Sequence, residues 1–189
     1  ALAGTGFAID RERTRRLLGF AGLVTNTLDA VASRDYLLET AAAAAILGAT
    51  LSRYAQDLYV LYTYEFGTVD FPDRVAGTSS IMPQKKNPIV LEHIKGRTAP
   101  ITGALMSALA GVRNSNYTNI IDAGREALRP VWAALDDLRV SIALARVATD
   151  SAQPRAALML SRCHANFSTV TELADTLVRN WGVSFREAH

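Results

Sequence analysis

Residues 33–67 read SRDYLLETAAAAAILGATLSRYAQDLYVLYTYEFG, and this stretch decides the fold class. Ser33 is well suited to begin a helix and Gly67 to end one. Between them, apolar or small residues recur at alternating steps of four and three, at Leu37, Ala41, Ala44, Gly48, Leu51, Ala55, Leu58 and Tyr62. The pattern predicts one helix on the order of 50 Å long. A helix of this length is typical of a bundle or an oligomer core.

Two further stretches predict helices of the same bundle. The spacing of three and four recurs in the second half of the chain, at Leu128, Val131, Leu135, Leu138, Ile142 and Ala145. Pro130 is tolerated there only in the first helical turn, where amide hydrogens have no partner within the helix. Another helix is predicted at residues 89–112, and Pro100 should kink or interrupt it because the proline ring clashes with the carbonyl one turn back.

The rest of the chain predicts shorter helices and loops. Short helices are expected after Asp10 and, near the C-terminus, after Asn166 or Ser168. Residues 68–88 are rich in glycine, proline and serine and residues 113–124 are rich in asparagine, so both stretches are expected to be loops. The predicted fold class is therefore all-α. Loops on a rigid helical scaffold are the usual place for chemistry.

Composition excludes several classes of function. The chain has 189 residues, of which 49% are hydrophobic and 20% are charged, and this fits a globular domain with a core. Lysine and arginine number 20 against 18 acids, and the net charge of +2 is too small to indicate a nucleic-acid partner. No apolar run approaches the ~18 residues of a membrane span and the start carries no export signal, so a cytoplasmic protein is expected.

The two ends and the single cysteine give further expectations. The chain lacks an initiating methionine and stops at residues 185–189 inside a pattern typical of an unfinished helix, so we expect a piece of a longer polypeptide. Cys163 excludes a disulfide within the chain and suits a reducing compartment. We expect its side chain to be buried as a small apolar group.

Residues 77–88, GTSSIMPQKKNP, hold groups that could carry chemistry. Serine hydroxyls, two lysine ammonium groups, a glutamine carboxamide and several backbone amides lie within one short turn-forming stretch, and such groups bind anions. The alternative is a solvated connector whose lysines only keep the loop in water. Composition alone leaves both interpretations open.

The order of residues in this loop resembles the signature loop of the fumarase/aspartase superfamily, and Gln84-Lys85-Lys86-Asn87-Pro88 is the version typical of argininosuccinate lyase. The resemblance extends along nearly the whole chain and covers the middle of the family sequence. It implies an incomplete long-helix bundle of the fumarase/aspartase type. It further implies a homotetramer with active sites shared between subunits, and a small-molecule substrate without a cofactor, metal, nucleic-acid or membrane partner.

In that family, as the resemblance implies, a loop serine removes a proton from the carbon next to a carboxylate of a succinyl group. A carbon–nitrogen bond then breaks and fumarate is released. The matching serine here is Ser79, with its neighbour Ser80 as the alternative, and the substrate-binding lysine and asparagine match Lys85 and Asn87. Donors aimed at the carboxylate stabilise the charge that develops in the transition state, and a positive local field must activate the serine.

Glu92 matches the family acid that orients a histidine, and that histidine belongs to an N-terminal part of the family sequence outside this chain. Without the resemblance, Glu92 is a carboxylate placed favourably at the start of a helix. His93, His164 and His189 do not match the family histidine and are expected on the surface or in packing. No residue spacing indicates a metal site.

The second loop departs from the argininosuccinate lyase pattern. Tyr117 matches the family, whereas Asp122 and Arg125 stand where the family carries glutamine and lysine for the amino-acid part of argininosuccinate. Arg125 keeps the positive charge, but an ionised Asp122 cannot donate a hydrogen bond. The departure indicates either a different leaving amine or neutral drift in a solvent-facing loop.

The resemblance therefore implies a carbon–nitrogen lyase that eliminates fumarate from an N-substituted aspartate, with argininosuccinate, in arginine biosynthesis, as the first candidate. Residues 1–150 are expected to form a central helical-bundle domain that carries the loop of residues 77–88. Residues 151–189 are expected to begin a C-terminal helical domain, and the piece alone is expected to be inactive. The alternatives are a related lyase with a different amine or succinyl substrate, and a non-catalytic helical protein similar to the lens crystallins of this family.

Overall fold

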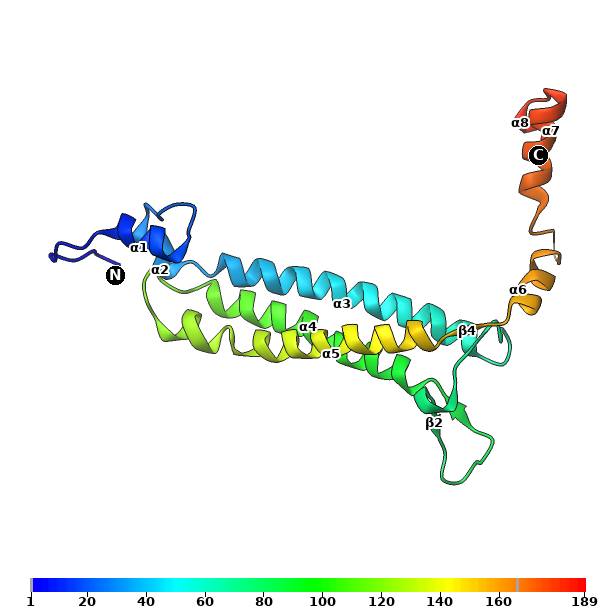
Figure 1. Ribbon diagram of the computed structural model, residues 1–189, viewed down its shortest axis with the longest axis horizontal. Helices are drawn as coiled ribbons and strands as arrows, with labels where there is room; N and C mark the ends of the chain where they lie inside the picture. Colours follow the sequence, from blue (N-terminus) through cyan, green and yellow to red (C-terminus); the bar gives the residue numbers. More distant parts are fainter. Residues whose placement is uncertain (1, 166) are drawn as a thin grey trace. The chain divides into compact units, whose positions relative to one another are not determined.

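The computed structural model describes residues 2–165 and 167–189 and is mostly helical (Figure 1), which confirms the predicted fold class. In chain order its elements are α1 (Arg11–Leu18), α2 (Thr27–Ala32), α3 (Asp35–Tyr62), β1 (Val69–Asp70), the 3-10 turn η1 (Asp73–Val75), β2 (Gly77–Thr78), β3 (Lys86–Asn87), α4 (Ile89–Val112), the π-helical turn η2 (Asp122–Glu126), α5 (Arg129–Ser151), β4 (Gln153–Pro154), α6 (Ala156–Cys163), α7 (Val170–Trp181) and α8 (Phe185–Ala188). The chain divides into two compact units. The first contains the residues up to Tyr54 and His93–Ala145, and the second contains Ala55–Glu92 and Arg146–His189.

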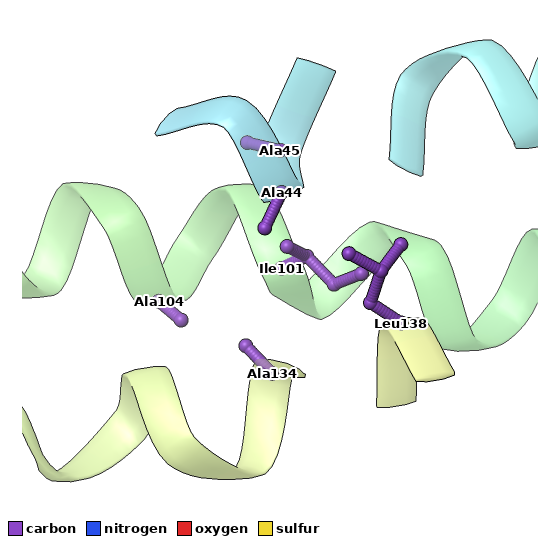
Figure 2. Packing of buried hydrophobic residues seen from close by; sticks show 6 residues of the cluster. All are labelled: Ala44, Ala45, Ile101, Ala104, Ala134 and Leu138. Atoms are coloured by element: carbon purple, nitrogen blue, oxygen red, sulfur yellow. The ribbon is translucent and has the colours of Figure 1, made fainter. Parts of the chain in front are cut away.

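The first unit has a core between α3, α4 and α5, which lie side by side (Figure 1). Figure 2 shows one cluster of this core, to which all three helices contribute: Ala44, Ala45, Ile101, Ala104, Ala134 and Leu138. A second cluster consists of Leu37, Ala41, Ala108, Leu128 and Val131. Alanine is the most frequent residue of the first cluster, and small side chains at the contact allow helix axes to lie close together.

Two glycines allow close contacts within the first unit. A β-carbon on Gly48 of α3 would lie 3.3 Å from the Ile101 Cδ1 atom of α4. A β-carbon on Gly111, near the end of α4, would lie 2.5 Å from the β-carbon of Ala127. Two carbon atoms cannot approach so closely without repulsion, so the chain passes α4 at Ala127 only because position 111 carries no side chain.

The prediction of one long helix is confirmed as α3, and the predicted apolar face is buried or half-buried along its length. The ends of the helix differ from the prediction. The helix begins at Asp35, and the Ser33 hydroxyl accepts a hydrogen bond from the Asp35 amide at 3.3 Å. It ends at Tyr62, whereas Gly67 lies in the following loop in the left-handed conformation, with a φ of 54°.

The predicted apolar face of α5 is confirmed except at one position. Ile142 is 47% exposed, whereas the neighbouring Ser141 is fully buried. The Ser141 hydroxyl donates a hydrogen bond to the Asp137 carbonyl at 2.8 Å, so its polar group is satisfied within the helix. The prediction for Ile142 was wrong because a serine that is satisfied in this way can occupy a core-facing position. Pro130 lies in the first turn of α5, as predicted, where its missing amide hydrogen costs no hydrogen bond of the helix.

Helix α4 continues through Pro100, so the helix is not interrupted there. A proline deprives the carbonyl four residues earlier, here that of Gly96, of its usual hydrogen-bond donor. Both Gly96 and Pro100 are exposed, and water can therefore satisfy this carbonyl. The Thr98 hydroxyl, on the buried face, donates to the Ile94 carbonyl at 3.0 Å.

The second unit contains strand pairs that the sequence did not predict. β1 pairs antiparallel with β4, so that Val69 lies opposite Pro154. β2 pairs antiparallel with β3, so that Gly77 lies opposite Asn87. Each strand has only two residues, which is too short for an alternating pattern to be visible in the sequence.

The short helices largely follow the predictions. The Asp10 carboxylate caps α1 by accepting a hydrogen bond from the Arg13 amide at 3.0 Å. Helix α7 begins at Val170, near the predicted Ser168, whereas the alternative start at Asn166 lies outside the described residues. None of the described helices is both long and apolar enough to cross a membrane.

One expectation for the C-terminal part was wrong. Cys163 is exposed rather than buried, because α6 is a short helix without a buried residue. Residues 185–188 form the short helix α8. The hydroxyl of Ser184 and the carboxylate of Glu187 form a reciprocal capping box at its start, and the His189 amide donates to the Phe185 carbonyl at its end.

Candidate active site

The loop of residues 77–88 is a hairpin in the second unit. Its stem is the β2–β3 pair, in which Thr78 lies opposite Lys86. Within the connecting turn, the Lys85 amide donates a hydrogen bond to the Met82 carbonyl at 3.0 Å. Ser79 follows β2 and Lys85 precedes β3, so the hairpin brings both residues to the base of the turn. These contacts are local, so the sequence of the loop itself determines this arrangement.

Two backbone amides donate hydrogen bonds to the Ser79 hydroxyl. Its Oγ atom accepts hydrogen bonds from the amides of Ile81 at 3.3 Å and Met82 at 3.1 Å. Hydrogen bonds from two donors favour negative charge on the accepting oxygen. The side chain of Ser79 is half-buried, whereas that of the neighbouring Ser80 is exposed.

The two adjacent lysines have different environments. The Lys86 Nζ atom lies 2.8 Å from Asp73 Oδ1 and 4.0 Å from Asp70 Oδ1. The hydrogen bond that the Lys86 ammonium group donates to Asp73, together with the negative charges of Asp73 and Asp70, raises the pKa of Lys86 above its usual value. The side chain of Lys85 is exposed to solvent.

An arginine from the other part of the second unit extends this charge network. The Arg155 Nη2 atom donates a hydrogen bond to Asp70 Oδ2 at 2.8 Å, and the Arg155 amide donates to the Thr68 carbonyl at 2.9 Å. The hydrogen bond from Arg155 lowers the pKa of the Asp70 carboxyl group below its usual value, against a smaller raising effect of burial. Asp70 therefore stays ionised between two cationic side chains.

Tyr62, the last residue of α3, contacts the stem of the hairpin. Its hydroxyl donates a hydrogen bond to the Lys86 carbonyl at 3.1 Å. Its ring packs edge-on against Phe71, with 5.6 Å between ring centroids, and Phe71 is fully buried. Burial raises the pKa of the Tyr62 hydroxyl, so it remains protonated and able to donate.

A groove of about 740 Å³ opens beside the stem of the hairpin. It is lined by aromatic, cationic and amide side chains, among them Tyr62, Tyr64, Phe66, Lys86, Asn87, Gln84, Arg155 and Arg162. The Arg162 guanidinium lies 5.9 Å from the centroid of the Phe66 ring. Of the residues that the sequence proposed for the site, Asn87 lines the groove, whereas Ser79, Lys85 and Glu92 do not.

Glu92 lies in the first turn of α4, where its carboxylate faces solvent and its amide donates to the Pro88 carbonyl at 3.3 Å. The segment that joins the hairpin to α4 is short, so Glu92 belongs to the same unit as Ser79. Its position also suits the positive end of the helix dipole.

The second candidate loop belongs to the first unit. Tyr117 is 65% exposed. Asp122 and Arg125 lie on η2, a π-helical turn, and not in an irregular loop as expected, and both side chains are exposed. The Asp122 Oδ1 atom accepts a hydrogen bond from the Ala123 amide at 2.6 Å, and Ala123 is buried. π-helical turns often occur at functional sites, but the sequence carries no simple signal for them.

Several residues around the hairpin were not predicted to belong to the site. Asp70 and Asp73 precede the loop in the sequence and could have been considered as partners of its lysines. Arg155 could not, because 85 positions separate it from Asp70. Within residues 2–165 and 167–189, no group of three or more histidine, cysteine, aspartate or glutamate side chains is arranged to hold a metal ion.

Comparison with protein families and curated proteins gives consistent matches. Residues 1–103 match a family model described as a lyase, and residues 167–189 match one described as the argininosuccinate lyase C-terminal region. Argininosuccinate lyase 1 of Shouchella clausii is 46% identical over 189 residues, which cover all of this chain and 38% of that protein. Argininosuccinate lyase of Methanocaldococcus jannaschii is 40% identical over 192 residues, which cover all of this chain and 39% of that protein. The chain thus spans well under half the length of these curated relatives.

Solved structures share the fold. A crystal structure of EDDS lyase in complex with formate is 34% identical with a TM-score of 0.80, over all of this chain and 37% of that chain. An EDDS lyase variant with bound fumarate aligns with the same values. A Brucella melitensis protein described as fumarate lyase:delta crystallin aligns over 92% of this chain and 43% of that chain with a TM-score of 0.66, and at 19% identity it shows the fold alone.

Proposed function

Because this chain belongs to the argininosuccinate lyase family, we propose that it is the central part of a longer carbon–nitrogen lyase that releases fumarate from an N-substituted aspartate. Argininosuccinate is the first candidate substrate, with arginine as the second product. The observation that carries the proposal is the hairpin, which gathers the serine, lysine and asparagine that the family's chemistry requires.

Ser79 is the proposed base. Two features favour it over Ser80: its Oγ atom accepts two backbone amide hydrogen bonds, and its side chain is half-buried. In the proposed reaction the ionised Ser79 oxygen takes the proton from the carbon next to a substrate carboxylate. The electron pair of that carbon–hydrogen bond forms the double bond of fumarate, and the carbon–nitrogen bond breaks. The amine leaves with the electron pair of that bond and is protonated.

Lys85 and Asn87 are the proposed ligands of the substrate carboxylate. Proton removal beside a carboxylate places additional negative charge on its oxygens, so an ammonium group and an amide donor there stabilise the transition state more than the ground state. The exposure of the Lys85 side chain is consistent with binding an external anion. Closure of the hairpin over substrate would exclude water and strengthen these interactions.

Glu92 and the second loop are assigned to supporting roles. Glu92 is proposed to orient a histidine from a part of the protein outside this chain. Tyr117, Asp122 and Arg125 are proposed to contact the leaving amine, and Asp122 and Arg125 are the positions that would change which amine fits. Their exposure leaves these side chains available to a ligand or to another segment.

We assign the complete protein to a cytoplasmic homotetramer with active sites shared between subunits. Large apolar side chains that are exposed on the three long helices support this assignment, among them Ile46, Met106, Leu109, Trp132 and Ile142. Within that protein, residues 1–150 are proposed to form the central bundle domain and residues 151–189 to begin the C-terminal domain.

A second candidate function is elimination of fumarate with a different amine. The similarity to EDDS lyase and the departures at Asp122 and Arg125 favour it, because both concern the amine part of the substrate. A purely structural role, as in lens crystallins, has no specific observation in its favour. The presence of Ser79, Lys85 and Asn87 in the hairpin counts against a purely structural role.

The test is the release of fumarate by the full-length polypeptide that contains this chain, followed by ultraviolet absorbance. Argininosuccinate, EDDS and a panel of other N-substituted aspartates are supplied separately. A parallel chimera replaces the matching segment of Shouchella clausii argininosuccinate lyase 1 with these 189 residues. Fumarate release from argininosuccinate supports the first function, and release only from another substrate supports the second. No release from any of them by a folded protein excludes both.

A further inference from the structure

We infer that Lys86 is a positioning residue of the hairpin, held by Asp73, and that this ion pair presents Asn87 and Lys85 to the substrate. The inference rests on the proposed function and concerns the lysine to which the family resemblance gives no role. The Lys86 Nζ atom lies 2.8 Å from Asp73 Oδ1. Asp73 precedes the hairpin in the sequence, and Lys86 lies in its second strand. The ion pair therefore links strand β3 to the segment that precedes strand β2.

The orientation of Lys86 affects Asn87, because the two residues are neighbours in the same short strand. Lys86 and Asn87 are the two residues of β3, and both line the groove beside the stem. An ion pair that fixes Lys86 to Asp73 therefore also holds the adjoining Asn87 in place. Lys85 directly precedes Lys86 and Asn87 directly follows it. The two proposed substrate ligands are therefore the immediate neighbours of the residue that the ion pair holds.

The backbone of Lys86 is held as well as its side chain. Its carbonyl accepts the hydrogen bond of the Tyr62 hydroxyl at 3.1 Å. Asp70, 4.0 Å from the Lys86 ammonium group, is itself bound by Arg155 at 2.8 Å. The position of β3 is thus fixed by groups from α3, from the segment before the hairpin and from the segment after α5.

The same contacts separate the two lysines by function. The positive charge of Lys86 is matched by Asp73 and, at longer distance, by Asp70. In the part of the chain that the structure describes, Lys85 has no ion pair, so its charge remains for an anionic ligand. A substrate carboxylate would meet an unmatched cation at Lys85 and a matched one at Lys86.

The side chain of Asp73 is 89% exposed, so the ion pair is expected to make a modest contribution. Loss of the pair lowers the fraction of hairpins in the binding-competent arrangement, and the apparent affinity falls by that fraction. In the full-length polypeptide, Asp73→Asn should raise KM ~2–5-fold and leave kcat almost unchanged. Lys86→Met should do the same, and the double variant should be no worse than either single variant, because both remove one interaction.

Two variants and one independent measurement complete the test. Lys86→Arg keeps a cation and should retain a KM close to the wild-type value. Asp150→Asn removes a similarly exposed ion pair with Arg146, at 3.5 Å on α5, and should change neither constant. Hydrogen exchange of the amides of residues 78–88, followed by mass spectrometry, should be faster in Asp73→Asn and Lys86→Met than in wild type and Asp150→Asn.

The inference is overturned if Asp73→Asn alters neither KM nor hydrogen exchange. It is also overturned if Lys86→Met lowers kcat much more than Asp73→Asn does, since Lys86 would then act on the substrate directly. If the wild-type protein releases no fumarate from any substrate, the proposed function fails. The exchange measurement still decides whether the ion pair orders the hairpin.

Discussion

Single residues of the hairpin differ in their hydrogen-bond partners even where they are of the same type. Ser79 and Ser80 are adjacent hydroxyls, yet only the Ser79 Oγ atom accepts the amides of Ile81 and Met82 in the described structure. The order of residues was sufficient to propose Ser79. The hydrogen bonds that favour negative charge on its oxygen depend on the turn geometry, and no spacing rule reveals them.

Replacement of Ser79 by alanine in the full-length polypeptide should lower kcat by about 10²–10⁴-fold, the usual contribution of a general base. KM should change little, because the proposed carboxylate ligands remain. Ser80→Ala serves as the matched control and should be milder. Steady-state fumarate release measures both variants. If Ser80→Ala lost activity while Ser79→Ala kept most of it, the assignment of the base would be wrong.

A second prediction at this scale concerns specificity. The Asp122 carboxylate should repel a substrate carboxylate and attract a cation, and like charges in a partly desolvated site can cost several kcal/mol. Asp122→Gln combined with Arg125→Lys should therefore raise kcat/KM for argininosuccinate relative to other N-substituted aspartates. The comparison is wild type against the double variant over that panel. If wild type already exceeds ~10⁴ M⁻¹s⁻¹ with argininosuccinate and the double variant gains nothing, the two departures are neutral.

A third prediction concerns the ionisation of Asp70. Its pKa lies below the usual 3.8 because Arg155 donates a hydrogen bond to its carboxylate. A carboxyl group whose pKa is depressed in the folded state adds stability that is fully present above pH 3.8 and is lost as the pH falls through the folded-state pKa. Carbon-13 NMR of the Asp70 carboxyl should show a midpoint below 3.8. Arg155→Gln should move the midpoint upward, and an unchanged midpoint would contradict the assigned cause.

The pKa of Lys86, the lysine beside Asp70, is shifted in the opposite direction. The pKa of Lys86 is raised above its usual 10.5, so the stability it adds is fully present below pH 10.5 and is lost as the pH rises through the folded-state pKa. The charges of Asp70 and Lys86 thus persist over the whole neutral range. The order of the hairpin should accordingly not change with pH near neutrality.

Whole elements were predicted where a repeating pattern was long enough to be recognised. The spacing of apolar residues identified α3 and α5, since each repeats its pattern over several turns, and the helical stretch predicted at residues 89–112 is α4. The strands β1 to β4 were missed because two residues contain no repeat, and the π-helical turn η2 was missed because its extra residue follows no rule of composition. Ile142 was placed on the wrong face because periodicity alone favoured isoleucine over Ser141.

The close approach between α4 and Ala127, the residue that follows η2, gives a prediction for stability. Gly111→Ala would place a β-carbon 2.5 Å from that of Ala127, and the strain should destabilise the fold by ~1–3 kcal/mol despite the higher helix propensity of alanine. Gly103, on the same helix, has open space around its α-carbon. Gly103→Ala should therefore stabilise by about 0.5–1 kcal/mol.

Urea unfolding followed by circular dichroism measures both glycine variants. The two substitutions are chemically identical and differ only in what the new methyl group meets. Equal effects of both would show that Ala127 can move aside at little cost, and the close contact would then not constrain the helix pair.

At the scale of the whole molecule, the chain is incomplete relative to its relatives, since it covers 38% of the length of the first of them. The chain alone should be helical, should self-associate through the exposed apolar side chains of α3, α4 and α5, and should release no fumarate. Circular dichroism, light scattering and the ultraviolet fumarate assay test these three expectations. Appreciable fumarate release by the isolated chain would show that the segments outside it are not required for catalysis.

The two units also limit what the sequence could predict about the site. The proposed base and carboxylate ligands lie in the second unit, and the proposed amine contacts Tyr117, Asp122 and Arg125 lie in the first. Local motifs identified each set separately. Neither a motif nor a helical repeat tells which distant segments meet.

The tip of the hairpin has a consequence for the lifetime of the chain in the presence of proteases. Residues 80–86 are all exposed, and they contain the adjacent pair Lys85 and Lys86, at which a lysine-directed protease can cut. One cut there would separate Ser79 from Asn87 and leave α3, α4 and α5 intact. Such a nicked protein would keep its helical signal, so far-ultraviolet dichroism would not detect the cut, whereas electrophoresis under denaturing conditions would.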